Sequence, residues 1–166
     1  MDRRVVTPSK KGKGFIQPTK IHQEWYIDIS YINTGGTFYF LISVLDGFSR
    51  TTVHWELRET LKELDIELVI AKGIEKHPGV KPRIISDNGP QFISNDFKAF
   101  VREYGLTHSR TSPYYPQSNG KWERWHGSLT SECIRPGPPA TKKKAETRIA
   151  KYVNYYNTVR LHSAIG

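Results

Sequence analysis

The stretch Ile84-Ile85-Ser86-Asp87-Asn88-Gly89-Pro90-Gln91-Phe92 begins as a short apolar run that stops abruptly at a carboxylate. An Asn-Gly-Pro sequence follows at once and is a strong turn signal. This pattern is typical of a buried strand that displays an acidic side chain at its carboxyl end. Asp87 is therefore a candidate site residue, and its chemistry depends on which other carboxylates lie near it.

Alternating and apolar runs before this stretch predict three strands, over residues 24–32, 37–45 and 51–57. Gly35-Gly36 and Asp46-Gly47 lie between them and are typical of tight turns. We therefore expect these strands to form an antiparallel meander. The opening stretch supplies a fourth strand, and residues 106–110 predict a short fifth one.

Helical spacing appears between the strands and after them. Thr60 and Glu63 have the signature of a capping box, which predicts a helix that ends near Lys76. Its buried stripe is predicted at Leu61, Leu64, Leu68 and Ala71. Asn95 can cap a second helix that ends at Gly105.

The last third of the chain predicts a loop and two more helices. Residues 111–120 are too rich in turn formers to be regular, and a helix is predicted over residues 121–133. A final amphipathic helix has its predicted buried stripe at Ala145, Ile149, Tyr152, Val153 and Tyr156.

This order of elements predicts an α/β domain with a mixed sheet, because a strand reached through a helical crossover usually runs parallel to its neighbour. The ribonuclease H-like fold has the same order. We therefore expect a mixed five-stranded sheet flanked by helices.

The composition favours a polyanionic partner. Twenty-five Lys and Arg against sixteen Asp and Glu give a formal charge of +9, which favours nucleic acid over an anionic membrane, with solubility as the alternative explanation. The single cysteine, Cys133, excludes an intramolecular disulfide, and no apolar stretch approaches the roughly 20 residues that span a bilayer. These features predict an intracellular, soluble protein.

Two acids meet the requirements of a divalent-metal site, where carboxylates from different buried elements converge. Asp28 lies in the middle of the first predicted strand, and Asp87 ends the fourth. If these strands are adjacent, both side chains can approach one ion. The alternatives are a turn-forming Asp at residue 87 and a strand acid with a protein partner at residue 28.

A third candidate, Glu123, lies in the first turns of the helix predicted over residues 121–133. It falls at the edge of an apolar stripe formed by Trp122, Trp125, Leu129 and Cys133, so it faces a cleft more readily than bulk solvent. The alternative is an acid that only complements the helix N-terminal dipole. Four other acids have sufficient structural explanations, a turn for the first and solvated helix faces for the rest: Asp46, Asp65, Asp96 and Glu103.

Asp28, Asp87 and Glu123, with thirty-five residues between the last two, resemble the D,D(35)E triad of retroviral-integrase-like DDE transposases. The resemblance extends to five blocks, in order, of bacterial insertion-sequence transposases: residues 25–30 (WYIDIS), 44–50 (VLDGFSR), 86–92 (SDNGPQF), 112–124 (SPYYPQSNGKWER) and 155–166 (YYNTVRLHSAIG). It covers the chain from about Lys20 to the end. Residues 1–20 would then be a basic arm or linker, and residues 21–166 the integrase-like catalytic core.

The resemblance implies a core that cuts DNA at the ends of a mobile element and joins the freed 3′ hydroxyl to a target strand. Asp28, Asp87 and Glu123 would be catalytic residues that bind Mg²⁺, with Mn²⁺ as a substitute, as two ions roughly 4 Å apart. Implied partners are element-end and target DNA and further copies of the chain. The implied location is the bacterial cytoplasm, in association with the nucleoid.

Several residues around Glu123 are candidates for DNA contact. Aromatic and polar side chains of the preceding loop can stack on unpaired bases or contact the strand, and basic ones can contact phosphates. The candidates are Tyr114, Tyr115, Gln117, Asn119, Lys121, Arg124 and His126. For His126 a packed or cleft-edge imidazole is an equal alternative.

The chain departs from the family pattern at two points. Many relatives have a Lys one or two turns after the catalytic Glu, where this chain has Gly127 and Thr130, and Arg124 and His126 are possible substitutes. The first twenty residues also lack a helix-turn-helix pattern. The chain would then be an excised core or a truncated copy, and a core that binds DNA without catalysis is the alternative function.

Overall fold

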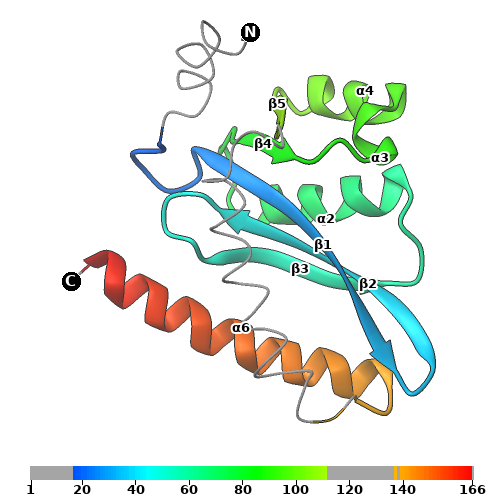
Figure 1. Ribbon diagram of the computed structural model, residues 1–166. Helices are drawn as coiled ribbons and strands as arrows, with labels where there is room; N and C mark the ends of the chain where they lie inside the picture. The colour runs from blue at the N-terminus through cyan, green and yellow to red at the C-terminus, as the bar shows by residue number, and fades with distance from the viewer. Residues whose placement is uncertain (1–16, 112–136, 138, 166) are drawn as a thin grey trace, which may run out of the picture.

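The computed structural model describes residues 17–111, 137 and 139–165, and it contains a five-stranded sheet between two layers of helices (Figure 1). The strands are β1 (Glu24–Thr34), β2 (Thr37–Asp46), β3 (Thr52–Arg58), β4 (Arg83–Ser86) and β5 (Thr107–Arg110). The helices are α2 (Glu63–Lys76), α3 (Pro90–Ile93), α4 (Asn95–Glu103) and α6 (Lys142–Ile165). No helix within this part of the chain is long and apolar enough to cross a membrane.

The sheet has the predicted mixed topology. Its strand order is β3-β2-β1-β4-β5, with antiparallel pairing between β1, β2 and β3 and parallel pairing of β4 with β1 and of β5 with β4. The β1–β2 turn requires Gly35 and Gly36, whose φ angles are 58° and 101°, a region that side chains disfavour. The predicted meander and mixed sheet are therefore confirmed.

Each face of the sheet has its own apolar core, because successive strand residues point to opposite faces. The α2/α4 core consists of Trp25, Ile27, Ile42, Val44, Ile66, Val69, Ile70, Ile84, Phe92, Phe97, Phe100, Val101 and Leu106. The α6 core consists of Tyr26, Ile32, Leu41, Leu45, Leu57, Ile85, Ala145, Ile149, Tyr152 and Val153. Figure 1 shows α2, α3 and α4 on one side of the sheet and α6 on the other.

Helix α6 presents the predicted stripe, with four of its five members buried and Tyr156 partly buried. Asn157 also joins this helix to the free edge of β3. Its side-chain Oδ1 accepts a hydrogen bond from the Thr52 N–H (2.8 Å), and its Nδ2 donates to the Thr52 carbonyl oxygen (3.0 Å). The terminal sequence block therefore has a structural role in holding α6 to the sheet.

Helix α2 differs from the prediction in its start and in its buried face. It begins at Glu63, and the Asp65 carboxylate, rather than that of Glu63, accepts from the Lys62 N–H at 2.8 Å. Two members of the predicted stripe are exposed, Leu64 at 62% and Leu68 at 38%. The helix has a second stripe that also follows helical spacing, and this one is buried: Ile66, Val69, Ile70 and Gly73.

Packing against Trp25 explains why the second stripe of α2 faces the sheet. A Cβ at Gly73 would lie 3.2 Å from the Trp25 ring, so the missing side chain lets the indole approach the helix closely. In α4, Ser94 rather than Asn95 is the N-cap, and its Oγ accepts from the Phe97 N–H at 3.1 Å. The helix predicted over residues 121–133 lies outside the described residues.

Candidate active site

Asp28 lies in the middle of β1, half-buried, on the α6 face of the sheet. Its face follows from strand alternation, because Tyr26 and Ile32 lie two and four residues away and both belong to the α6 core. Its antiparallel partner on β2 is Ser43, a residue with no exposed surface.

Asp87 directly follows β4, the parallel neighbour of β1. The two strands pair Trp25 with Ile84 and Tyr26 with Ile85. Continuing this register by two residues places Asp87 level with Asp28 and on the same face, since Ile85 also belongs to the α6 core. The predicted adjacency of the two strands is confirmed. That both carboxylates approach one ion follows from continuing the register past the end of β4 and stays a prediction.

The Asp87 carboxylate is exposed and oriented by its own turn. Its Oδ1 accepts a hydrogen bond from the Gly89 N–H at 2.8 Å. The turn-forming interaction anticipated from the sequence is therefore present. It engages one of the two carboxylate oxygens and is compatible with a ligand at the other. Asn88 supports the same turn through a 3.3 Å hydrogen bond from its Nδ2 to the Thr111 carbonyl oxygen.

Gly89 lies unusually close to this carboxylate. A Cβ at residue 89 would lie 3.0 Å from Asp87 Oδ1 and 2.8 Å from Gln91 Oε1. Its φ is −58°, so the backbone conformation itself is open to any residue. Glycine at residue 89 therefore leaves room for the side chains of Asp87 and Gln91, and its φ angle does not require it.

We expect Gly89→Ala to displace the Asp87 carboxylate and to weaken divalent-metal binding about 10-fold, comparable to the loss of an outer-shell partner in a metal site. The free energy of unfolding should change by less than about 1 kcal/mol, because the φ angle suits alanine. Titration of Mn²⁺ into wild type and variant, together with urea unfolding, measures both quantities. Unchanged Mn²⁺ affinity would contradict the expected displacement.

Ser86, the residue before Asp87, is in contact with His108 of β5. The Ser86 Oγ donates to the Asp87 carbonyl oxygen (2.9 Å) and lies 2.8 Å from His108 Nε2. The sequence contains no local signal for this contact, because it arises only when β5 pairs with β4.

The donor set suits a hard divalent cation. Mg²⁺ prefers carboxylate oxygens and is commonly bound by one or two protein carboxylates together with water and substrate phosphate. Asp28 and Asp87 offer such a pair. Within residues 17–111, 137 and 139–165, no group of three or more His, Cys, Asp or Glu is placed to hold a metal ion.

The remaining predicted site residues lie outside the described part of the chain, so their positions stay predictions. They are Glu123, Tyr114, Tyr115, Gln117, Asn119, Lys121, Arg124 and His126. Cys133 lies outside it as well.

Asp46 and Asp65, which sequence reasoning set aside, are both buried. Asp46 has no exposed surface, and its carboxylate accepts from the N–H groups of His22 (2.7 Å), Phe48 (3.1 Å) and Ser49 (2.7 Å). Its predicted turn role is confirmed and extends to a distant segment. The prediction of a solvated helix face for Asp65 is wrong, because its residue is only 6% exposed.

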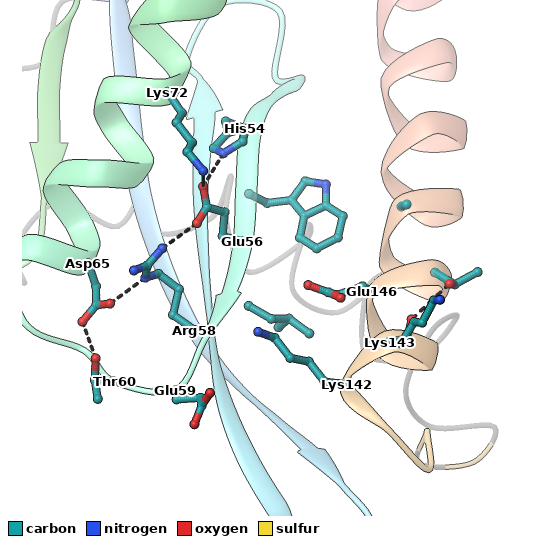
Figure 2. A pocket seen from close by; sticks show the side chains of 14 residues that line it. His54, Glu56, Arg58, Glu59, Thr60, Asp65, Lys72, Lys142, Lys143 and Glu146 are labelled. Carbon is teal, nitrogen blue, oxygen red and sulfur yellow. Dashed lines mark hydrogen bonds and ion pairs between the residues drawn. The ribbon is translucent and has the colours of Figure 1, made fainter.

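Asp65 belongs to an ionic cluster in a cavity of about 840 Å³ between β3, α2 and α6 (Figure 2). It accepts from Arg58 Nε (2.5 Å) and Thr60 Oγ1 (2.6 Å). Burial alone would raise the pKa of Asp65, but the hydrogen bonds from Thr60, Lys62 and Arg58 outweigh it and lower that pKa. This acid is therefore occupied by protein donors.

Glu56 occupies the other end of the same cluster. It lies 2.8 Å from His54, 2.7 Å from Arg58 and 3.3 Å from Lys72 (Figure 2). Burial would raise the pKa of Glu56, and the hydrogen bonds from His54, Arg58 and Lys72 lower it overall. The cavity lining includes neither Asp28 nor Asp87, so this cluster is separate from the candidate site.

Comparison with known sequences shows the family to which this chain belongs. The integrase core domain family matches residues 18–116, and a second integrase core domain family matches residues 104–166. The transposase for insertion sequence element IS904 of Lactococcus lactis is 28% identical over 95% of this chain and 66% of its own length. The putative transposase InsK for IS150 of Escherichia coli K12 is 23% identical over 86% of this chain and 51% of its own.

Solved structures show the same fold. The HTLV-2 integrase catalytic core domain in complex with magnesium (dimeric form) has a TM-score of 0.63 and 22% identity, and the alignment covers 80% of this chain and 84% of that one. A chain of the simian T-cell lymphotropic virus intasome, in complex with PP2A regulatory subunit B56 gamma, has a TM-score of 0.67 and 21% identity over 80% of this chain and 49% of its own. The ribonuclease H-like fold is thereby confirmed.

The chain spans about two thirds or less of the length of these two transposases. Within that span the family match covers more than half of the chain, including both Asp28 and Asp87. This chain therefore belongs to the integrase core domain family, as a relative of insertion-sequence transposases.

Proposed function

We propose that this chain is a catalytic core that cuts phosphodiester bonds at the ends of a mobile DNA element and transfers the freed 3′ hydroxyl into target DNA. The observation that carries the proposal is the parallel pairing of β1 with β4, whose register, continued by two residues, would bring Asp28 and Asp87 level on one face of the sheet. The relatives support the substrate class, since they are transposases of insertion sequences. The net charge of +9 suits a DNA partner.

Asp28, Asp87 and Glu123 would hold the metal ions, with Mg²⁺ as the physiological metal and Mn²⁺ as a substitute. When bound, two such ions supply activation of the attacking hydroxyl and charge stabilisation of the leaving oxygen. The Gly89 N–H would fix one oxygen of Asp87 and leave the other directed to the ion. The HTLV-2 core, described with magnesium, offers a precedent on the same fold.

Contacts with DNA would come from the segment around Glu123. Basic and polar side chains there would hold phosphates, and aromatic rings would stack on unpaired bases. The proposed contacts are Tyr114, Tyr115, Gln117, Asn119, Lys121, Arg124 and His126. Two element ends must meet, so the chain would act as a homo-oligomer on DNA, in the bacterial cytoplasm and in association with the nucleoid.

A nicking assay on supercoiled plasmid tests this function. We expect the full chain to nick the plasmid in Mg²⁺ or Mn²⁺, to lose activity in EDTA and to leave an RNA–DNA hybrid intact. Retention of the plasmid in a gel shift, weakening with salt, measures binding independently of cleavage. Salt-dependent binding with no nicking in either metal would support a DNA-binding core without catalysis instead.

A further inference from the structure

We propose that His108 is a positioning residue for Asp87, acting through the hydroxyl of Ser86. The inference rests on the proposed function, in which Asp87 is a metal ligand. Its starting point is the pair of contacts at Ser86 Oγ, which lies 2.9 Å from the Asp87 carbonyl oxygen and 2.8 Å from His108 Nε2.

The chemistry of these groups fixes the direction of both hydrogen bonds. A carbonyl oxygen only accepts, and a serine hydroxyl has a single proton. When the Ser86 proton is donated to the Asp87 carbonyl oxygen, as the 2.9 Å contact indicates, His108 Nε2 can bond to Ser86 Oγ only as the donor. The contact assigns His108 the tautomer that has its proton on Nε2.

The surroundings of His108 hold the ring in place. It packs edge-on against Phe97, with ring centroids 5.0 Å apart, and lies 6.1 Å from the Phe92 ring. Burial lowers the pKa of His108 to about 4, with a further contribution from Arg110, so the imidazole is neutral near pH 7. The contacts with Phe92 and Phe97 hold the neutral imidazole in one orientation, in which its Nε2 proton can point at Ser86.

The contacts restrain Asp87 on both sides. The carbonyl group before it, that of Ser86, accepts from the Thr111 N–H at 2.7 Å. The carbonyl group after it is held by the Ser86 hydroxyl. With both flanking peptide groups fixed, the Gly89 N–H sets the side-chain orientation through Asp87 Oδ1.

Strand alternation places this support on the opposite face from the carboxylate. Ser86 follows Ile85, whose side chain belongs to the α6 core, and His108 pairs with Ile84 and contacts the α2/α4 core. His108 therefore acts from behind the sheet, with the Asp87 backbone between it and the site. Its effect on a metal or on DNA must pass through Asp87.

Two substitutions separate positioning from packing. His108→Gln places an amide donor near the position of Nε2, whereas His108→Leu retains an apolar side chain and removes the donor. We expect His108→Leu to weaken Mn²⁺ binding about 10-fold and His108→Gln to stay within about 2-fold of wild type, on the scale known for outer-shell partners. Ser86→Ala should weaken Mn²⁺ binding as much as His108→Leu does. Thr107→Ala, at an exposed position on β5, is the control and should leave the affinity unchanged. A role in packing alone predicts the reverse order, with leucine tolerated better than glutamine.

Two NMR measurements test the inference without metal or DNA. Nitrogen shifts should show His108 with a protonated Nε2 and an unprotonated Nδ1 in the full chain. The Gly89 amide proton, which reports on the Asp87 carboxylate, should shift in His108→Leu and Ser86→Ala and stay in place in His108→Gln. A proton on Nδ1, or equal shifts in the leucine and glutamine variants, would overturn the proposal even if the wild type nicks DNA. If the wild type does not nick, the same readouts still decide the role of His108.

Discussion

Asp87→Asn is expected to reduce metal-dependent nicking by more than about 100-fold, beyond the 10–100-fold range for the loss of an outer-shell partner. Asparagine removes the negative charge but keeps an oxygen that can accept from the Gly89 N–H, which lies 2.8 Å from Oδ1 in the wild type. The turn should therefore survive. Because residue 87 is exposed, the free energy of unfolding should change by less than about 0.5 kcal/mol.

The matched control is Asp96→Asn, an exposed acid in the first turn of α4. It changes the net charge by the same amount, so any general effect of charge on DNA binding appears in both variants. Initial nicking rates in Mg²⁺, with urea unfolding of each protein, separate chemistry from stability. Nicking by Asp87→Asn at the rate of the control would remove Asp87 from the catalytic set.

Asp46→Ala is expected to lower the free energy of unfolding by about 3–5 kcal/mol, because three backbone N–H groups lose their acceptor in a site closed to solvent. One of them belongs to His22, so the segment before β1 should loosen as well. Urea unfolding of the full chain measures the loss. Asp46→Asn should lower the free energy of unfolding by less. Its side-chain carbonyl oxygen can still accept a hydrogen bond from the Ser49 N–H.

Asp96→Ala provides the comparison for this series, because its side chain lies at the surface. An unfolding midpoint for Asp46→Ala equal to that of Asp96→Ala would show that the buried hydrogen bonds contribute little. Asp87 and Asp46 both lie at strand ends, but their substitutions should have different effects. Substitution of Asp87 should change the nicking rate, and substitution of Asp46 should change the free energy of unfolding.

Asp28 and Asp87 could be located from sequence because their positions depend on local patterns. Alternation fixes the face of Asp28, and an apolar run before an Asn-Gly-Pro turn fixes Asp87 at a strand end. The strands that hold them, β1 and β4, are neighbours, as the element order favours, and the approach of the two carboxylates stays a prediction. Glu123 was found by spacing and family resemblance, and its place in the site stays a prediction.

The errors arose where tertiary contacts choose between local alternatives. Helix α2 has two apolar stripes that both follow helical spacing, and the contact of Trp25 with Gly73 selects between them. Asp65 looked like a solvated helix acid because its partner Arg58 belongs to another element. The sequence did not identify His108 as a site residue, because its contact with Ser86 forms only when β5 pairs with β4.

The hydrogen bonds of Asn157 have a consequence for how fragments of this protein should be cut. Thr52 lies on an edge strand, and an uncovered edge is a template for aggregation between copies. The Asn157 amide occupies both backbone groups of Thr52, so it shields the start of that edge as a neighbouring strand would. A fragment that ends before residue 157 would leave this part of the edge uncovered, even though both acids of the candidate site lie far upstream.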